Sequence, residues 1–164
     1  MGRENRKKRQ SAGFTMLEML MVLAIISTLG SVAIPTFSGW LPDRRLKAAA
    51  RDLYSHIQGA KMEAVKQHTD INVTFQTGPD SYTVPGVLPG PVVLGDYKSG
   101  ICYGAPGGFT NSYTTITYNQ RGICTAGSDT YVYITNDRKS DYYRVGPNPA
   151  GIVHLEKGNG SAFE

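Results

Sequence analysis

The pattern of apolar and polar residues changes twice along the chain and so divides it into three parts. A continuous apolar run fills residues 14–34, where Glu18 is the only formal charge. At 21 residues, the run is long enough to cross a bilayer as a helix. A carboxylate near the end of such a run is costly unless it is paired, which indicates a function for Glu18.

Residues 35–67 are predicted to continue this segment as an amphipathic helix. Pro35 and Pro42 bound a short interruption, Trp40 suits a membrane interface, and Asp43 is a candidate N-cap where the helical pattern returns. The two segments can together form one long, kinked helix of about 50 residues. Apolar residues after the interruption recur at steps of three and four, which predicts one buried helix face: Leu46, Ala50, Leu53, Ile57, Ala60 and Ala64.

Residues 68–164 change to the alternation that is typical of β-strands, separated by turn-forming residues. An antiparallel sheet packed on the amphipathic half of the helix would cover its apolar stripe, so the pattern predicts an α+β fold. Hairpin connections are expected at 136–141 and 147–151. The predicted strands cover residues 71–75, 82–84, 92–94, 116–118, 131–135, 142–145 and 152–155.

The formal net charge of +4 comes from the basic leader, residues 1–13. The leader holds five Lys and Arg residues and one Glu, so residues 14–164 carry twelve basic and twelve acidic side chains. A basic leader before an apolar segment indicates that the N-terminus stays in the cytoplasm. The positive charge therefore indicates the orientation of the chain in the membrane, and it does not indicate a nucleic-acid partner.

The junction of leader and apolar run resembles the processing site and N-terminal helix of type IV pilins and type II secretion pseudopilins. The resemblance is carried by Gly13 before the cut, Phe14 as the new terminus, Thr15 and Leu17, Glu18 as the fifth mature residue, and Pro35 further along. It implies that a prepilin peptidase cleaves between Gly13 and Phe14 and methylates the new amine of Phe14. The family also polymerises through these helices, in which one subunit's Glu18 could neutralise a neighbour's terminal amine.

Two other interpretations of the same segment stay open. Ser31-Val32-Ala33 forms a passable cleavage site for an ordinary secretory signal, although Glu18 and Pro35 fit that interpretation poorly. The segment could also be a plain single-pass anchor in which Glu18 is incidental. The three interpretations predict different mature N-termini.

The second half of the chain resembles the FimT/GspH group of minor pilins and minor pseudopilins. Residues 116–122 are similar to that group's strand-and-turn element, and residues 143–153 are similar to its closing hairpin. The resemblance implies a non-enzymatic subunit of a type IV pilus or type II secretion pseudopilus. Its partners would be prepilin peptidase and other pilins or pseudopilins. Its precursor would span the bacterial inner membrane once, with the N-terminus cytoplasmic and the C-terminal domain periplasmic. A major, fibre-forming pilin is the alternative within this class.

The two cysteines, Cys102 and Cys124, both fall in the part expected outside the cytoplasm. An even count in an oxidising compartment favours a disulfide over a redox or metal site. Such a bond would close a loop of about 20 residues and stabilise the fold by roughly 3 kcal/mol. Two separately buried thiols are the alternative.

No arrangement of residues indicates catalysis, so no enzyme activity, metal or cofactor is expected. The three histidines, His56, His68 and His154, lack the spacing of a metal-binding helix face and are expected to be solvated or packed. Nucleophile-elbow and phosphate-loop motifs are missing from the sequence. The ten tyrosines are expected on a half-exposed sheet.

Some FimT-type pilins bind DNA, and a competence pilin of this kind is the alternative from another functional class. The family feature is a basic Gly-Arg-x-Arg motif near the C-terminus, whereas residues 156–164 contain no arginine. The nearest basic residues, Arg138, Lys139 and Arg144, are interleaved with Asp137 and Asp141. Phosphate binding needs several uncompensated cations on one surface, so nucleic acid is not expected as a partner.

Overall fold

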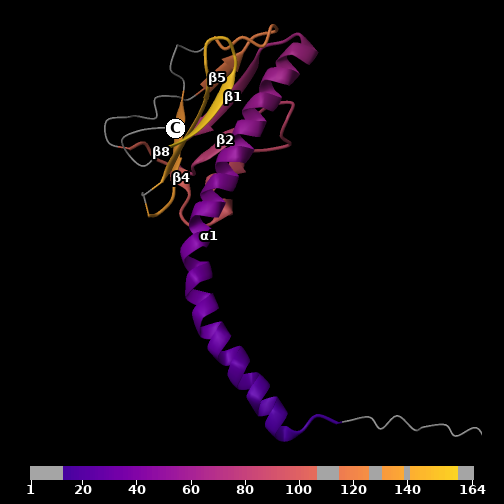
Figure 1. The fold of residues 1–164 in the computed structure, drawn as a ribbon. Helices are drawn as coiled ribbons and strands as arrows, with labels where there is room; N and C mark the ends of the chain where they lie inside the picture. The colour runs from indigo at the N-terminus through magenta and orange to yellow at the C-terminus, as the bar shows by residue number, and fades with distance from the viewer. Residues whose placement is uncertain (1–12, 107–114, 126–130, 139–140, 159–164) are drawn as a thin grey trace, which may run out of the picture. The chain divides into compact units, whose positions relative to one another are not determined.

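The computed structural model of the chain describes residues 13–106, 115–125, 131–138 and 141–158, with the backbone alone for residues 32–38. The chain divides into two compact units, residues 1–39 and 40–164. One helix, α1 (Met16–Gln67), contains 52 residues and begins the described secondary structure (Figure 1). The predicted long helix is therefore confirmed.

The interruption predicted between Pro35 and Asp43 is wrong, because α1 continues through both prolines. Each proline removes one backbone hydrogen bond, but packing of the following amphipathic turns stabilises the helix against this loss. Asp43 is not an N-cap: its carboxylate accepts a hydrogen bond from the side-chain amide of Asn136, at 3.2 Å. The helix ends at Gln67: the next residue, His68, has a left-handed φ of 52°, and the N–H of Thr69 donates to the carbonyl of Ala64.

The strands of the described residues form two four-stranded antiparallel sheets. The first has the order β3 (Val92–Val93), β2 (Ser81–Thr83), β1 (Ile71–Gln76) and β5 (Thr115–Tyr118), and η1 (Leu94–Tyr97) follows β3. The second has the order β4 (Cys102–Tyr103), β6 (Val132–Thr135), β7 (Tyr142–Pro147) and β8 (Val153–Gly158). The α+β fold class and every predicted strand are confirmed, but the single sheet is replaced by two, and β4 was not predicted.

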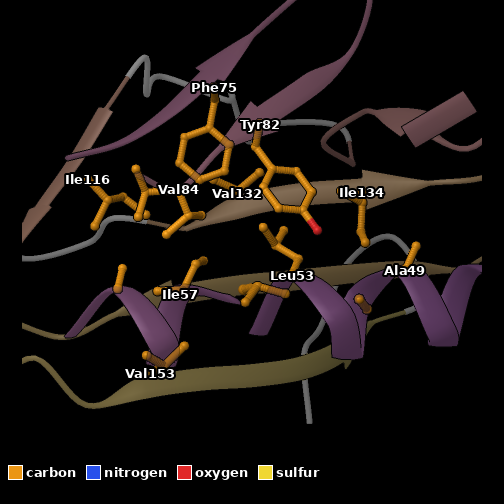
Figure 2. Close-up of a cluster of buried hydrophobic side chains, with 14 of the residues drawn as sticks. Ala49, Leu53, Ile57, Phe75, Tyr82, Val84, Ile116, Val132, Ile134 and Val153 are labelled. Atoms are coloured by element: carbon orange, nitrogen blue, oxygen red, sulfur yellow. The ribbon is translucent and has the colours of Figure 1, made fainter. Parts of the chain in front are cut away.

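The apolar stripe of α1 packs against residues of both sheets and makes one core, as Figure 2 shows. All six residues of the predicted stripe are fully buried, and Ala49 joins them. In the close-up, Leu53 and Ile57 face Val84, Ile116 and Val132, and Val153 lies beside the same helix. Burial of a leucine or isoleucine side chain stabilises a fold by about 1.5–3 kcal/mol, so this stripe holds the sheets on the helix.

Several tyrosines are inside the domain, which corrects the expectation of a half-exposed set. Tyr82, Tyr118, Tyr133 and Tyr143 are buried. Burial raises the pKa of Tyr82 and of Tyr118 well above the usual range of a phenol. The phenol oxygen of Tyr82 lies 2.8 Å from Nδ1 of His56, so this histidine is packed at the helix–sheet interface.

Candidate processing and assembly site

Gly13, Phe14 and Thr15 precede α1 and have no regular secondary structure. Phe14 is 75% exposed, and a Cβ added at Gly13 would meet no atom within 4 Å. The peptide bond between Gly13 and Phe14 is therefore accessible to a protease in this chain. A larger residue at Gly13 would not disturb the described structure, so its effect on processing can be measured without a change of fold.

Thr15 and Glu18 together start the helix. The backbone N–H of Glu18 donates to the hydroxyl of Thr15 at 3.2 Å, and Met19 N–H makes the first helical bond to the Thr15 carbonyl. A threonine followed three residues later by a glutamate is the capping-box pattern, which was not predicted although its spacing is visible in the chain. Glu18 consequently occupies the third helical position, where its negative charge also suits the positive end of the helix dipole.

The first turns of α1 expose an apolar surface on all sides. Ten large apolar side chains there are more than two-fifths exposed. Three side-chain hydroxyls in this segment donate hydrogen bonds to backbone carbonyls of the same helix: Ser27 to Leu23, Thr28 to Ile25 and Ser31 to Thr28, at 2.7–2.8 Å. The donors of these three hydroxyls are therefore satisfied within the helix. The apolar residues are Met16, Leu17, Met19, Leu20, Met21, Val22, Leu23, Ile25, Ile26 and Leu29.

Among the residues that the structure describes, no helix is sufficiently long and apolar to cross a membrane. Residues 32–34 of the predicted span at 14–34 lie outside the residues whose side chains are described.

Two turns in the globular unit share one sequence pattern, Asn-x-x-Gly-Ile. They are residues 119–123, after β5, and residues 148–152, between β7 and β8. In the first turn, Asn119 exchanges backbone hydrogen bonds with Gly122 and Ile123, and its side-chain oxygen accepts from Ile123 N–H at 3.0 Å. Asn148, Gly151 and Ile152 repeat this arrangement, with the side-chain bond at 2.9 Å.

The two turns contact each other and the end of α1. Both glycines have positive φ, 73° at Gly122 and 75° at Gly151, which favours glycine strongly. A Cβ at Gly151 would overlap the carbonyl oxygen of Gly122, and a Cβ at Gly122 would lie about 3.1 Å from Lys61 and Val65 of α1. Residues 116–122 and 143–153, on which the resemblance to the FimT/GspH group rests, thus contact each other at Gly122 and Gly151.

We expect Gly151→Ala to lower the free energy of unfolding by at least about 2 kcal/mol. Alanine is strained at the left-handed φ of this position, and its Cβ would overlap the backbone of Gly122. Thermal or denaturant unfolding of the full chain measures this. Gly90→Ala is the control, since its Cβ would meet nothing within 4 Å. The control should change stability by less than about 1 kcal/mol. Equal stability of the two variants would contradict the contact between the turns.

Four exposed apolar residues lie on these turns and on the adjoining end of α1, and we call them the apolar cluster: Met62 and Val65 from α1, with Ile123 and Ile152 from the turns. Met62 is 71% exposed and Ile152 53% exposed. A cleft of about 260 Å³ separates the helix from the second turn and is lined by Met62, Lys61 and Ile152, among others. Grouped apolar residues at a surface commonly mark a contact with another protein.

Cys102 lies in the second sheet, and Cys124 lies beside the first. Cys102 is the first residue of β4, while Cys124 is buried and pairs through a backbone bridge with Tyr118 of β5. A disulfide between them would link the two sheets directly, and it stays a prediction.

Of the basic residues considered for nucleic acid, Arg144 is engaged with a carboxylate, and the nearby Lys157 is paired as well. Arg144 Nε donates to Glu156 Oε2 at 2.7 Å, and Lys157 pairs with Asp141, also at 2.7 Å. Lys139 and residues 159–164 lie outside the described residues. No group of three or more His, Cys, Asp or Glu side chains suits a metal ion within the described part of the chain.

Comparison with known proteins gives matches to both halves. Residues 8–34 match the prokaryotic N-terminal methylation motif, and residues 49–151 match the family described as type II transport protein GspH. The crystal structure of the type IV minor pilin FimU of Pseudomonas aeruginosa is similar, with 16% identity and a TM-score of 0.54. The match covers 74% of this chain and 94% of that chain, and at this identity it shows a shared fold. No curated protein matches.

Proposed function

Because the chain belongs to the GspH family of type II transport proteins and carries the N-terminal methylation motif, we propose that it is cleaved between Gly13 and Phe14 and assembled through its N-terminal helix. It is a structural subunit of the minor pilin or pseudopilin type. The methylation motif implies processing by a prepilin peptidase, and the family implies membrane-anchored assembly with other pilins. The globular unit acts by contact, without catalysis.

The observation that carries the proposal is the start of α1, where an accessible Gly13–Phe14 bond precedes a capped, apolar helix with one carboxylate. Residues 1–13 are the cleaved leader in this account, residues 14–34 the membrane and polymerisation segment, residues 35–67 its continuation, and residues 68–164 the pilin domain. The five leader cations hold the N-terminus in the cytoplasm and place the domain in the periplasm.

In the proposed assembly, Glu18 fixes the register of one helix against the next. Cleavage creates an ammonium group on Phe14, four residues from Glu18 in the same chain and exposed to neighbouring chains. A carboxylate in an apolar bundle is stabilised by an opposite charge, so the Glu18 carboxylate of one subunit pairs with the Phe14 amine of another. The cap from Thr15 keeps Glu18 on a formed helix while this pairing takes place.

The apolar cluster is the proposed contact with a neighbouring subunit. Ile123→Thr together with Ile152→Thr should leave stability nearly unchanged, because both side chains are exposed. Incorporation of the full chain into fibres should fall by about tenfold or more, since full burial of an isoleucine contributes about 1.5–3 kcal/mol and about half of each side chain is left for a partner to cover. The measurement compares membrane-held with fibre-incorporated protein.

Gln120→Ala is the matched control for this experiment, because Gln120 is exposed in the same turn as Ile123 but is polar. It should incorporate like the unchanged protein. Normal incorporation of the double isoleucine variant would remove the cluster from the proposed subunit contacts and leave the N-terminal helix alone in that role.

We also propose that Cys102 and Cys124 form a disulfide in the periplasm. Intact-mass analysis of the protein, alkylated with and without prior reduction, should show both thiols protected until reductant is added. The double variant Cys102→Ser, Cys124→Ser should lose roughly 3 kcal/mol of stability. Two readily alkylated thiols in the unreduced protein would contradict the bond.

A further inference from the structure

One face of α1 near the start of the globular unit carries an aromatic residue followed by three cations. Trp40, Arg44, Lys47 and Arg51 follow one another at steps of four, three and four residues, which places them on the same side of the helix. All four are exposed, and Trp40 is the only tryptophan of the chain. We call these four residues the basic face.

The aromatic and the first cation of this face are stacked. The guanidinium carbon of Arg44 lies 3.4 Å from the centroid of the Trp40 ring, a close cation–π contact. Beyond the stack, a cleft of about 510 Å³ is lined by Arg44, Lys47 and Arg51 with Ala48 and Asp52. The small side chain of Ala48 leaves room between the cations for an anion.

The cations of the basic face have no anionic partner in the described part of the chain. Arg44, Lys47 and Arg51 make no ion pair there. Two carboxylates are near, but neither forms an ion pair with these cations: Asp52, in the lining of the cleft, accepts a hydrogen bond from the Tyr97 hydroxyl at 2.7 Å, and Asp43 accepts one from Asn136. Three like charges within two helical turns repel one another, so an external anion would stabilise this surface.

The position of the basic face along the chain indicates which anion it binds. Trp40 follows the end of the proposed membrane segment by six residues, and tryptophan is preferred at the level of lipid headgroups. Arg44 and Lys47 lie about 6 and about 10 Å further along the helix than Trp40, and helical side chains lean back toward the N-terminus. Both cations can therefore reach phosphates near the Trp40 ring, with Arg51 at the outer end of the cleft.

We propose that the basic face binds the phosphate of an anionic phospholipid in the periplasmic leaflet before the subunit is assembled. The inference rests on the proposed membrane anchoring of the mature chain. Nucleic acid fits less well, because three cations on about 10 Å of one helix cover a single headgroup, whereas a strand needs a longer row of contacts. The site would hold the globular unit against the membrane surface.

The test uses the full mature chain in mild detergent with equal amounts of phosphatidylglycerol and phosphatidylcholine. Native mass spectrometry counts the lipids retained. Phosphatidylglycerol should be retained preferentially, and Lys47→Gln with Arg51→Gln should lower that preference by roughly fivefold for each cation removed. This variant leaves Trp40 and Arg44 in place. In vesicles, quenching of Trp40 by headgroup-labelled lipid should increase with phosphatidylglycerol content and decrease with salt.

The control variant, Lys61→Gln with Lys66→Gln, removes the same charge from the other end of α1 and should keep the preference. Equal retention of both lipids, or an unaffected Lys47 and Arg51 variant, would overturn the inference. Inorganic phosphate that binds without any lipid preference would indicate a free-anion site, and tighter binding of a short DNA duplex would indicate nucleic acid; either result overturns it. Resistance to alkaline extraction from membranes reports anchoring separately, so loss of anchoring is distinguishable from loss of lipid preference.

Discussion

Gly13→Leu is expected to abolish maturation, so that the chain accumulates in the membrane as the uncleaved precursor. In the pilins that the leader junction resembles, the residue before the cut is very small, and Gly13 is the last residue of the leader, directly before Phe14. The added side chain meets no atom of the described structure within 4 Å of its Cβ, so misfolding does not explain the loss. Comparing precursor and mature masses in membranes gives the result directly.

Gly30→Leu is the matched control for the Gly13 variant. It makes the same substitution further along the apolar segment, where an added Cβ also has no neighbour within 4 Å. The control should be processed normally, since it lies well past the cleavage site. Normal processing of Gly13→Leu would count heavily against the pilin interpretation.

Glu18→Ala is expected to leave insertion and cleavage intact but to lower incorporation into fibres, on the order of tenfold if one charged hydrogen bond is lost. Removal of the charge should ease residence in the membrane, because an acidic residue costs up to about 2.5–3.5 kcal/mol there. A defect in insertion therefore cannot account for reduced assembly. The effect is expected to be partial, because the exposed apolar side chains of the helix are unchanged in this variant.

The capping role of Glu18 requires two further variants. Glu18→Gln keeps a side chain that can complete the capping box but removes the charge, whereas Thr15→Ala removes the cap and keeps the charge. If pairing with the Phe14 amine is the function, Glu18→Gln should fail like Glu18→Ala, and Thr15→Ala should assemble. The opposite order would assign the effect to helix capping. Fractionation into membrane and fibre measures all three variants.

The helix of this protein could be predicted from local patterns, because its signals are carried by residues close in sequence. The stripe from Leu46 to Ala64 follows the helical period and is fully buried. Pro42 and Asp43 misled the prediction, since a proline and a good capping residue usually mark a boundary. Here the packing of the turns beyond Asp43 outweighs the local preference.

The arrangement of the strands depends on contacts between distant residues, and alternation alone does not specify it. β1 pairs with β5, more than 40 residues away in the sequence, while β4 pairs with β6. A two-residue strand such as Cys102–Tyr103 has no periodicity to detect. The division into two sheets was consequently missed, although the strand positions were predicted.

The site was partly visible in the sequence. Gly13, Phe14 and Glu18 were singled out through the resemblance of the leader junction to a pilin processing site, and their roles stay predictions. The capping box at Thr15 could have been identified from its spacing. The repeated Asn-x-x-Gly-Ile pattern was also present to be seen. The contact between the two turns could not be predicted from this pattern, because only the fold brings Gly122 against Gly151 and places the turns beside α1.

The central claim is that this chain is matured as a pilin-type subunit, and the N-terminal residue of the mature protein tests it most directly. Mass spectrometry of the N-terminal peptide, taken from protein in membranes and in fibres, should find a chain that begins at Phe14 and carries one methyl group on its amine. A chain that begins at Ile34 would instead show an ordinary secretory signal cut after Ala33. An intact leader in both fractions would show a plain membrane anchor, and either result would contradict the account.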